Sequence, residues 1–332
     1  MLELGACDSN ASRRCTSSSA RFRPHRSGSL ALHVSLFEVG PGRATSPTPS
    51  DFALVQLSHD LYNNLATYAG FTQLSSGSCS TLPNGATLIT AFDIPATDTQ
   101  AVLWKFPAKK QLVVSFPGTA SGQDWLTDLV FFPVPYISAN IDCPLCSVHV
   151  GFLAAWNSIS ASLMEELRKA LEGNEGYTTI ITGHSLGGAI AQLAFASLKE
   201  EEWRVEAAYT YGQPRVGNLL FSHYIDSISK ASDADPGNFY RVTHANGKLF
   251  TVKDREKGPD DLIDGVPSLP PALLGFVHSR TEYWESAESP AANSTFRCDG
   301  KENIGCNAGQ FSLGINGAHL SYGGFDLQCV PT

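Results

Sequence analysis

The chain has 332 residues, of which 42% are hydrophobic and 17% are charged, and it carries a formal net charge of −9. This composition indicates a globular protein that is long enough for one α/β domain with a sizeable core. The acidic balance argues against a nucleic-acid partner and provides no polybasic membrane anchor. No run of about 18 apolar residues occurs, so the sequence predicts no transmembrane segment.

Residues 1–45 differ from the rest of the chain. The segment between Asp8 and Glu38 contains five arginines and no acidic residue. The apolar stretch Leu30–Val39 is interrupted by polar side chains, so it is a poor match to the hydrophobic region of a secretory signal. The segment as a whole superficially resembles a transit peptide. We expect residues 1–45 to be an extension outside the folded domain, arising from a misassigned start that omits the true signal peptide. Residues 46–332 are expected to form a single domain.

Periodic patterns along the remaining chain predict alternating strands and helices. Ser50 is a candidate N-cap for a helix over residues 51–68, in which leucines recur on one face. Short turns make the first two strands antiparallel. The later strand–helix alternation predicts a mainly parallel central sheet with helices on both faces and reactive loops at the carboxyl ends of the strands. Strands are expected at residues 87–93, 101–106, 111–116, 177–182, 206–211 and 239–244, and further helices at 152–171, 188–198 and 218–229.

The most specific pattern is Gly183-His184-Ser185-Leu186-Gly187, between the strand at 177–182 and the helix at 188–198. It matches the Gly-x-Ser-x-Gly sequence of a nucleophile elbow, in the strand–turn–helix context that such an elbow requires. The tight turn needs small flanking residues, and the new helix directs its free N–H groups toward the serine. The alternative is a glycine-rich turn with an incidental serine.

A serine nucleophile needs a histidine as general base and a carboxylate that orients the histidine. With this elbow, the acid and then the histidine follow the serine along the chain. Four histidines follow Ser185: His223 falls in a predicted helix, His244 ends a strand, His278 precedes another strand, and His319 lies in a late loop. Position favours His319 as the base and leaves the other three as alternatives.

Several motifs occur in an order known from one family. They are Ser115–Thr119, Val148–Phe152, Thr182–Ala189, Tyr211–Asn218, Val266–Pro271, Glu282–Trp284 and Ala318–Tyr322. On these motifs the chain resembles the fungal class 3 lipases, which include triacylglycerol lipases and related feruloyl esterases, from about Ser50 to Cys329. The resemblance implies an α/β-hydrolase fold, a Ser-Asp-His triad with His319 as the base, and a lipid ester substrate.

The resemblance also implies that the acid directly follows a Thr-His-x-Asn segment, in a pattern that continues to Val-Pro. Here Thr243–Asn246 is followed by the strongly charged segment Gly247–Ile263, and only then does Asp264 resume the pattern. We therefore expect Asp264 to be the acid, and our hypothesis is that residues 247–263 are a retained intron read in frame. The alternative acids, interpreted as part of a solvated charge run, are Asp254, Asp260 and Asp261.

Acyl transfer also needs backbone N–H donors for the oxyanion. Leu186, directly after the nucleophile, is expected to supply one donor. The resemblance implies that Thr119 supplies the other, with its hydroxyl group as a second contact. An ordinary turn threonine is the alternative. The family usually has an arginine at the position of Pro117. This departure puts in doubt the contacts that the arginine would make, but not the N–H donor of Thr119.

The segment after Thr119 predicts a short amphipathic helix. Trp125, Leu126 and Leu129 lie on one face, and polar side chains take the other. Such stripes usually belong to core helices. The position beside the predicted oxyanion hole instead favours the lid of the family, which covers the pocket in water and opens at a lipid surface. An apolar lid favours long acyl chains over soluble phenolic esters.

Eight cysteines indicate an oxidising compartment. The resemblance implies the pairs Cys79–Cys329, Cys143–Cys146 and Cys298–Cys306. A redox pair or half of a zinc site is the alternative for the C-x-x-C sequence, but no second one occurs, and we expect no metal and no cofactor. A glycosylation sequon at Asn293 agrees with secretion.

Together these patterns predict a secreted serine carboxylic-ester hydrolase, specifically a triacylglycerol lipase that acts at a lipid–water interface. A feruloyl esterase acting on plant cell-wall phenolic esters is the alternative within the family. A non-catalytic lipid- or glycan-binding relative is the alternative outside the enzyme class.

Overall fold

The computed structural model describes residues 54–75, 85–118, 131–137, 143–199, 201–245, 264–310, 315 and 317–327. These residues belong to a compact unit, Pro47–Thr332. The expected extension at residues 1–45 and the expected insert at 247–263 lie outside the described residues, so both remain predictions. Within the described ranges, no helix has the length and apolar character needed to cross a membrane.

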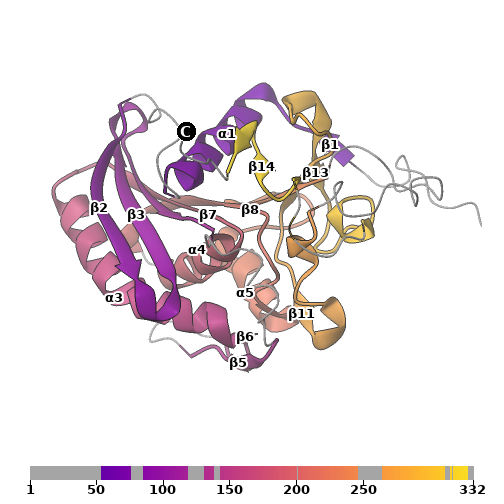
Figure 1. Cartoon of the computed structure of the whole chain (residues 1–332), viewed down its shortest axis with the longest axis horizontal. Coiled ribbons are helices and arrows are strands. Elements are labelled where there is room, and N and C mark those ends of the chain that lie inside the picture. Colours follow the sequence, from indigo (N-terminus) through magenta and orange to yellow (C-terminus); the bar gives the residue numbers. More distant parts are fainter. Residues whose placement is uncertain are drawn as a thin grey trace, which may run out of the picture. The chain divides into compact units, whose positions relative to one another are not determined.

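A nine-stranded sheet runs through the unit in the order β1-β13-β12-β10-β8-β7-β4-β3-β2 (Figure 1). β4, β7, β8, β10 and β12 are parallel, whereas β3 and β2 at one edge and β13 and β1 at the other pair antiparallel. The strands are β1 (Leu54–Gln56), β2 (Thr87–Ile94), β3 (Thr99–Phe106), β4 (Gln111–Phe116), β7 (Thr178–His184), β8 (Val205–Tyr211), β10 (Phe239–His244), β12 (Glu282–Glu285) and β13 (Thr295–Cys298).

Helices cover both faces of this sheet, as Figure 1 shows. Successive side chains of a strand point to opposite faces. On β4, Leu112 and Val114 therefore join one core with α3, α4 and α5, while Val113 joins another core with α1. The predicted fold class, a mainly parallel sheet with helices on both sides, is confirmed. The helices are α1 (His59–Ser75), α3 (Val150–Glu172), α4 (Leu186–Ser197) and α5 (Leu219–Ser229).

The expected helix over residues 51–68 is wrong at its start. Residues Leu54–Gln56 form β1 instead and pair with β13, with Leu54 opposite Cys298. The helix begins only at His59, and the side chain of Ser58 accepts a hydrogen bond from the N–H of Leu61 at 3.3 Å. Pairing with a distant strand overrides the local helical pattern because it satisfies the backbone groups of these residues.

The described residues also form two smaller sheets and several short turns. A four-stranded sheet has the order β11-β9-β6-β5, and a hairpin is formed by β14 and β15. The hairpin packs on α1, where the amide of Gln73 donates to the carbonyl of Asp326. These strands are β5 (Pro133–Pro135), β6 (Ser147–His149), β9 (Gly217–Asn218), β11 (Phe276–Val277), β14 (Ser321–Tyr322) and β15 (Phe325–Asp326). The 3₁₀ turns are η2 (Pro95–Thr97), η3 (Pro107–Lys109), η4 (Glu201–Trp203), η7 (Val266–Ser268), η8 (Ala272–Leu274), η9 (Ala292–Ser294) and η10 (Asn307–Gly309).

Among the described cysteines, two disulfides join segments that lie close in the sequence. Cys143 is bonded to Cys146, and Cys298, at the end of β13, is bonded to Cys306. The third expected pair, Cys79–Cys329, lies outside the described residues. The Cys298–Cys306 bond closes a loop that carries the charged residues Lys301 and Glu302.

Candidate active site

Ser185 occupies the turn between β7 and α4. Its backbone has φ 55° and ψ −126°, a conformation that is rare for a residue with a side chain and typical of strained functional positions. The turn is held because the N–H of Ser185 donates to the carbonyl of Tyr211 at 2.9 Å, and the N–H of Gly188 donates to the carbonyl of Ser185 at 2.9 Å. The structure thus has the elbow geometry that the sequence predicts at this position.

The flanking glycines are required by close backbone packing. A Cβ atom on Gly183 would lie 2.2 Å from the carbonyl oxygen of Gly187. A Cβ atom on Gly187 would lie 2.3 Å from the carbonyl oxygens of Phe116 and Pro117 at the end of β4. Both distances are far below a normal contact, so only glycine allows β4, β7 and α4 to meet this closely.

Asp264 and His319 are in direct contact although 55 residues separate them in the chain. Oδ2 of Asp264 lies 2.9 Å from Nδ1 of His319, and both side chains are buried. The hydroxyl group of Tyr322 donates to the same oxygen, and the N–H of Val266 donates to Oδ1 at 2.9 Å. The carboxyl group of Asp264 therefore has three polar partners.

These partners decide the charge of Asp264. Burial alone would raise its pKa, but the neighbouring His319 and the hydrogen bonds from Tyr322 and Val266 outweigh burial and hold the pKa below the usual value. An ionised carboxylate only accepts, so Nδ1 of His319 carries the hydrogen of their shared bond. The opposite ring nitrogen, Nε2, is then the one able to take a proton, which is the tautomer that a general base in a triad needs.

Ser185 and His319 are linked through His184 and Gly212. The ring centroids of His184 and His319 are 4.6 Å apart, and Nε2 of His184 lies 2.8 Å from the carbonyl oxygen of His319, which only accepts. Burial, together with the nearby His319, lowers the pKa of His184 to about 3, so its ring is neutral and donates here. Gly212 follows Tyr211, whose carbonyl oxygen accepts the hydrogen bond from the N–H of Ser185. A Cβ atom on Gly212 would lie 2.8 Å from Oδ2 of Asp264 and 2.8 Å from Nδ1 of His319.

The other candidate bases have different surroundings. His223 lies on α5, and the ring of His278 faces the carbonyl oxygen of Pro267 at 2.7 Å. The two ring nitrogens of His244 face the carbonyl oxygens of Ala318 and Ala287 at 3.0 and 2.8 Å. Among the described residues, His319 is the one histidine whose ring contacts a carboxylate.

The predicted oxyanion hole is described in part. Leu186 is the first residue of α4, where backbone N–H groups have no partner within the helix. Gly118 brings the end of β4 against the elbow, since a Cβ atom on it would lie 3.3 Å from Cβ of Ser185. Thr119 and the predicted lid residues Trp125, Leu126 and Leu129 lie outside the described residues and remain predictions.

Sequence reasoning missed Tyr322, His184 and Gly212 as parts of this site. All three lie inside or beside the motifs that carry the resemblance, so their positions were visible but their roles were not. The role of Tyr322 depends on a contact 58 residues away, and no local pattern indicates that partner. Burial and the charge of Asp264 hold the pKa of Tyr322 well above its usual value, so its hydroxyl group stays protonated and donates.

A mainly parallel sheet with a serine on its strand–helix elbow, beside a buried histidine–aspartate pair, defines the serine α/β-hydrolase class. Residues 113–248 match the family model of lipase (class 3). The chain is 31% identical over 281 residues to the lipase of Rhizomucor miehei, covering 79% of this chain and 69% of that protein. The chain belongs to the class 3 lipase family.

Other relatives agree with this assignment. A secreted mono- and diacylglycerol lipase of Fusarium solani is 33% identical over 231 residues, which cover 68% of this chain and 60% of that protein. The chain thus spans about three fifths of the length of that relative. A solved triacylglycerol lipase with a serine protease triad as its catalytic centre has a TM-score of 0.64 and 27% identity, covering 82% of this chain and 98% of its own.

Proposed function

We propose that this chain is a secreted serine carboxylic-ester hydrolase that acts on lipid esters, most directly as a triacylglycerol lipase. The observation that carries the proposal is the contact between Asp264 and His319 at the carboxyl end of the sheet, beside the elbow that presents Ser185. A buried, ionised carboxylate on Nδ1 of a histidine is the arrangement that prepares Nε2 to accept a proton from a serine.

In the proposed mechanism, Ser185 attacks the ester carbonyl carbon while Nε2 of His319 takes the hydroxyl proton. Asp264 holds the ring and stabilises the imidazolium that forms. The N–H groups of Leu186 and Thr119 stabilise the oxyanion of the tetrahedral intermediate. His319 then protonates the leaving alcohol, activates a water molecule, and the acyl-enzyme is hydrolysed to the free acid and the resting serine.

A lipid substrate is favoured by the surface that follows the acid. Leu273 and Leu274 form a turn a few residues after Asp264, and they are 96% and 51% exposed. Exposed large apolar side chains beside a catalytic loop suit contact with a lipid surface better than recognition of a soluble phenolic ester. The names of the relatives support glycerides as substrates and secretion as the destination, and they favour partial glycerides as the second candidate.

The test compares four emulsified or dissolved esters at equal concentration: a long-chain triacylglycerol, a diacylglycerol, a monoacylglycerol and methyl ferulate. The proposal expects the highest kcat/KM on the triacylglycerol; preference for the diacylglycerol or monoacylglycerol would select the second candidate, and preference for methyl ferulate would select a feruloyl esterase. Ser185→Ala should lose roughly 10³-fold or more in kcat while the fold is retained.

A fluorophosphonate probe separates this proposal from a non-catalytic lipid-binding relative. Covalent labelling of Ser185 in the wild-type chain, absent in Ser185→Ala, requires an activated serine. Wild-type protein that binds lipid emulsions but neither labels nor hydrolyses any of the esters would contradict the enzyme assignment.

A further inference from the structure

The segment directly after Asp264 is held by side chains from distant parts of the chain. Nε2 of His278 lies 2.7 Å from the carbonyl oxygen of Pro267. Nη1 of Arg215 donates to the carbonyl oxygens of Ser268 at 2.5 Å and of Pro270 at 3.1 Å. Three carbonyl groups within a few residues of the acid are therefore fixed by two side chains that do not contact the acid itself.

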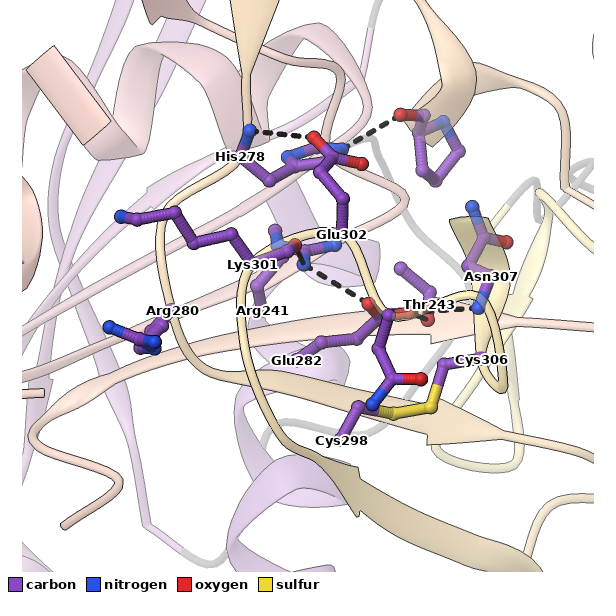
Figure 2. Close-up of polar contacts among 12 residues, drawn as sticks. Arg241, Thr243, His278, Arg280, Glu282, Cys298, Lys301, Glu302, Cys306 and Asn307 are labelled. Carbon is purple, nitrogen blue, oxygen red and sulfur yellow. Dashed lines mark hydrogen bonds and ion pairs between the residues drawn. A yellow bond between two sulfur atoms is a disulfide. The ribbon is translucent and has the colours of Figure 1, made fainter. Parts of the chain in front are cut away.

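Glu302 contacts both of these residues, through the side chain of Arg215 and the backbone of His278. Its two oxygens each lie 2.8 Å from nitrogens of the Arg215 guanidinium, a bidentate pair, and Oε1 also accepts the backbone N–H of His278 at 2.9 Å. Figure 2 shows this contact between His278 and Glu302, and the Cys298–Cys306 disulfide that closes the loop of Glu302 is drawn lower in the same view. A bidentate arginine–carboxylate pair fixes direction as well as distance, so the guanidinium can present its remaining N–H groups to the carbonyl groups in one orientation.

The charge states support this arrangement. Burial by itself would raise the pKa of Glu302, but the bonded Arg215 guanidinium and the backbone N–H of His278 outweigh burial and lower it to about 2. Burial, with Arg241 and Arg215 nearby, holds the pKa of His278 well below its usual value. The neutral ring of His278 must carry its hydrogen on Nε2, because the oxygen of Pro267 only accepts.

The held segment contacts the acid directly. Val266 begins the turn η7, and its N–H donates to Oδ1 of Asp264 at 2.9 Å, whereas His319 contacts the other oxygen, Oδ2. The carbonyl groups of Pro267 and Ser268 belong to the same turn. A change in the orientation of this turn therefore moves the donor that fixes the carboxylate, and the carboxylate in turn orients His319.

We propose that Arg215, His278 and Glu302 form an anchor cluster that positions Asp264 for catalysis. This inference rests on the proposed function, since it assigns these residues to the acid of that triad. They are positioning residues, because they act through the turn η7 and touch no reacting atom. The loop closed by the Cys298–Cys306 disulfide supplies Glu302, which gives that loop a role in the site.

The test is Glu302→Gln, which keeps the shape of the side chain and removes the charge that holds Arg215. With a soluble short-chain ester, kcat should fall roughly ten- to a hundredfold, because small displacements of a catalytic group have effects of this size, while KM stays within about twofold. The matched control is Lys301→Gln on the same loop, which breaks the buried ion pair with Asp226 and the bond to Ser222 but removes no side-chain contact of Arg215, His278 or Glu302. Its kcat should equal that of the wild type.

Hydrogen exchange gives a second readout that does not require turnover. Peptides covering residues 264–271 should exchange faster in Glu302→Gln than in the wild type. Their exchange rate in Lys301→Gln should equal that of the wild type. If Glu302→Gln does not fold, Arg215→Lys, which keeps the charge but not the bidentate pair, takes its place with the same expectations and a smaller loss. Wild-type kcat and exchange in a folded variant, or equal losses in variant and control, would overturn the inference. A wild-type chain without fluorophosphonate labelling would instead count against the proposed function, and the exchange measurement would still decide about the anchor cluster.

Discussion

The hydroxyl group of Tyr322 donates to Oδ2 of Asp264, the same carboxylate oxygen that faces the ring of His319. The aromatic ring of Tyr322 also lies 5.9 Å from the ring of His184 in the elbow. One side chain thus contacts both the acid of the proposed triad and the residue that precedes its nucleophile. Tyr322 comes three residues after His319 and is carried by the β14–β15 hairpin, which packs on α1.

Tyr322→Phe should reduce kcat by roughly ten- to a hundredfold, because a hydrogen bond to a charged group contributes about 1.5–3 kcal/mol. It should also raise the pKa of Asp264, whose present value is held down partly by this bond. A carboxyl group whose pKa is lowered in the folded state stabilises the fold, and this stabilisation is lost as the pH falls through that lowered pKa. Because the pKa of Asp264 is higher in the variant, acid unfolding should begin at a higher pH than in the wild type. Activity and urea unfolding between pH 3 and 7 measure both effects.

Tyr68→Phe is the matched control. Tyr68 is also buried and its hydroxyl group has one side-chain partner, Gln111, at 2.8 Å. This variant should lose stability but keep its kcat. Equal kcat in Tyr322→Phe and the wild type would show that the hydroxyl group is not needed to hold Asp264.

Gly212→Ala should inactivate the protein. Gly212 has a φ of 56°, and a Cβ atom on it would lie 2.8 Å from Oδ2 of Asp264 and from Nδ1 of His319. The added methyl group must push these two groups apart, so we expect kcat to fall by about a hundredfold or more. Gly176→Ala is the control, because Gly176 has a φ of 77° and no atom lies within 4 Å of the added Cβ. If both variants lose activity equally, the loss is caused by backbone strain and not by the contact of the added methyl group with Asp264 and His319.

The elbow can be predicted from the sequence because its constraints are local. Gly183 and Gly187 must be small for a contact within one turn, and a short motif records that requirement. The anchor cluster is different, since Arg215 and Glu302 are 87 residues apart and each looks like an ordinary charged residue. The misplaced start of α1 has the same origin: β1 pairs with β13 across most of the chain, and no local pattern reports that pairing.

Glu285 should make stability fall as pH rises. Burial raises its pKa from 4.5 to about 8, against the opposing bond from the N–H of Gly323. Between these values the unfolded chain has released this proton and the folded chain has not, so the free energy of unfolding decreases with pH by the equivalent of one proton. Glu285→Gln keeps an acceptor for Gly323 and removes this contribution.

Urea unfolding at pH 5, 6, 7 and 8 measures the difference. The slope of the free energy of unfolding against pH should be more positive in Glu285→Gln than in the wild type by about 1.4 kcal/mol per pH unit. Glu172→Gln, on an exposed position at the end of α3, should reproduce the wild-type slope. Identical slopes in all three proteins would mean that Glu285 is ionised in the folded state at these pH values.

The ends of the expected insert meet in a way that predicts the effect of removing it. The N–H of Asp264 donates to the carbonyl oxygen of His244 at 3.1 Å. Without residues 247–263 the chain would read His244-Ala245-Asn246-Asp264, and this same bond would be the i to i+3 bond of a β-turn. The described residues on either side therefore already have the separation that the shorter chain requires.

We expect the variant lacking residues 247–263 to fold, to label with a fluorophosphonate and to have a kcat at least equal to that of the full chain. Its free energy of unfolding should rise by about 1 kcal/mol, because closing a shorter loop loses less chain entropy. A variant in which the segment is replaced by Gly/Ser repeats of equal length separates the effect of length from that of charge, and should label like the full chain. Loss of labelling in the shortened variant, with its thermal stability retained, would show that the segment holds Asp264 in place. A peptide from the native protein that joins Asn246 directly to Asp264 would establish that the segment is absent from the mature chain, whereas native peptides that span residues 247–263 would refute the retained-intron hypothesis.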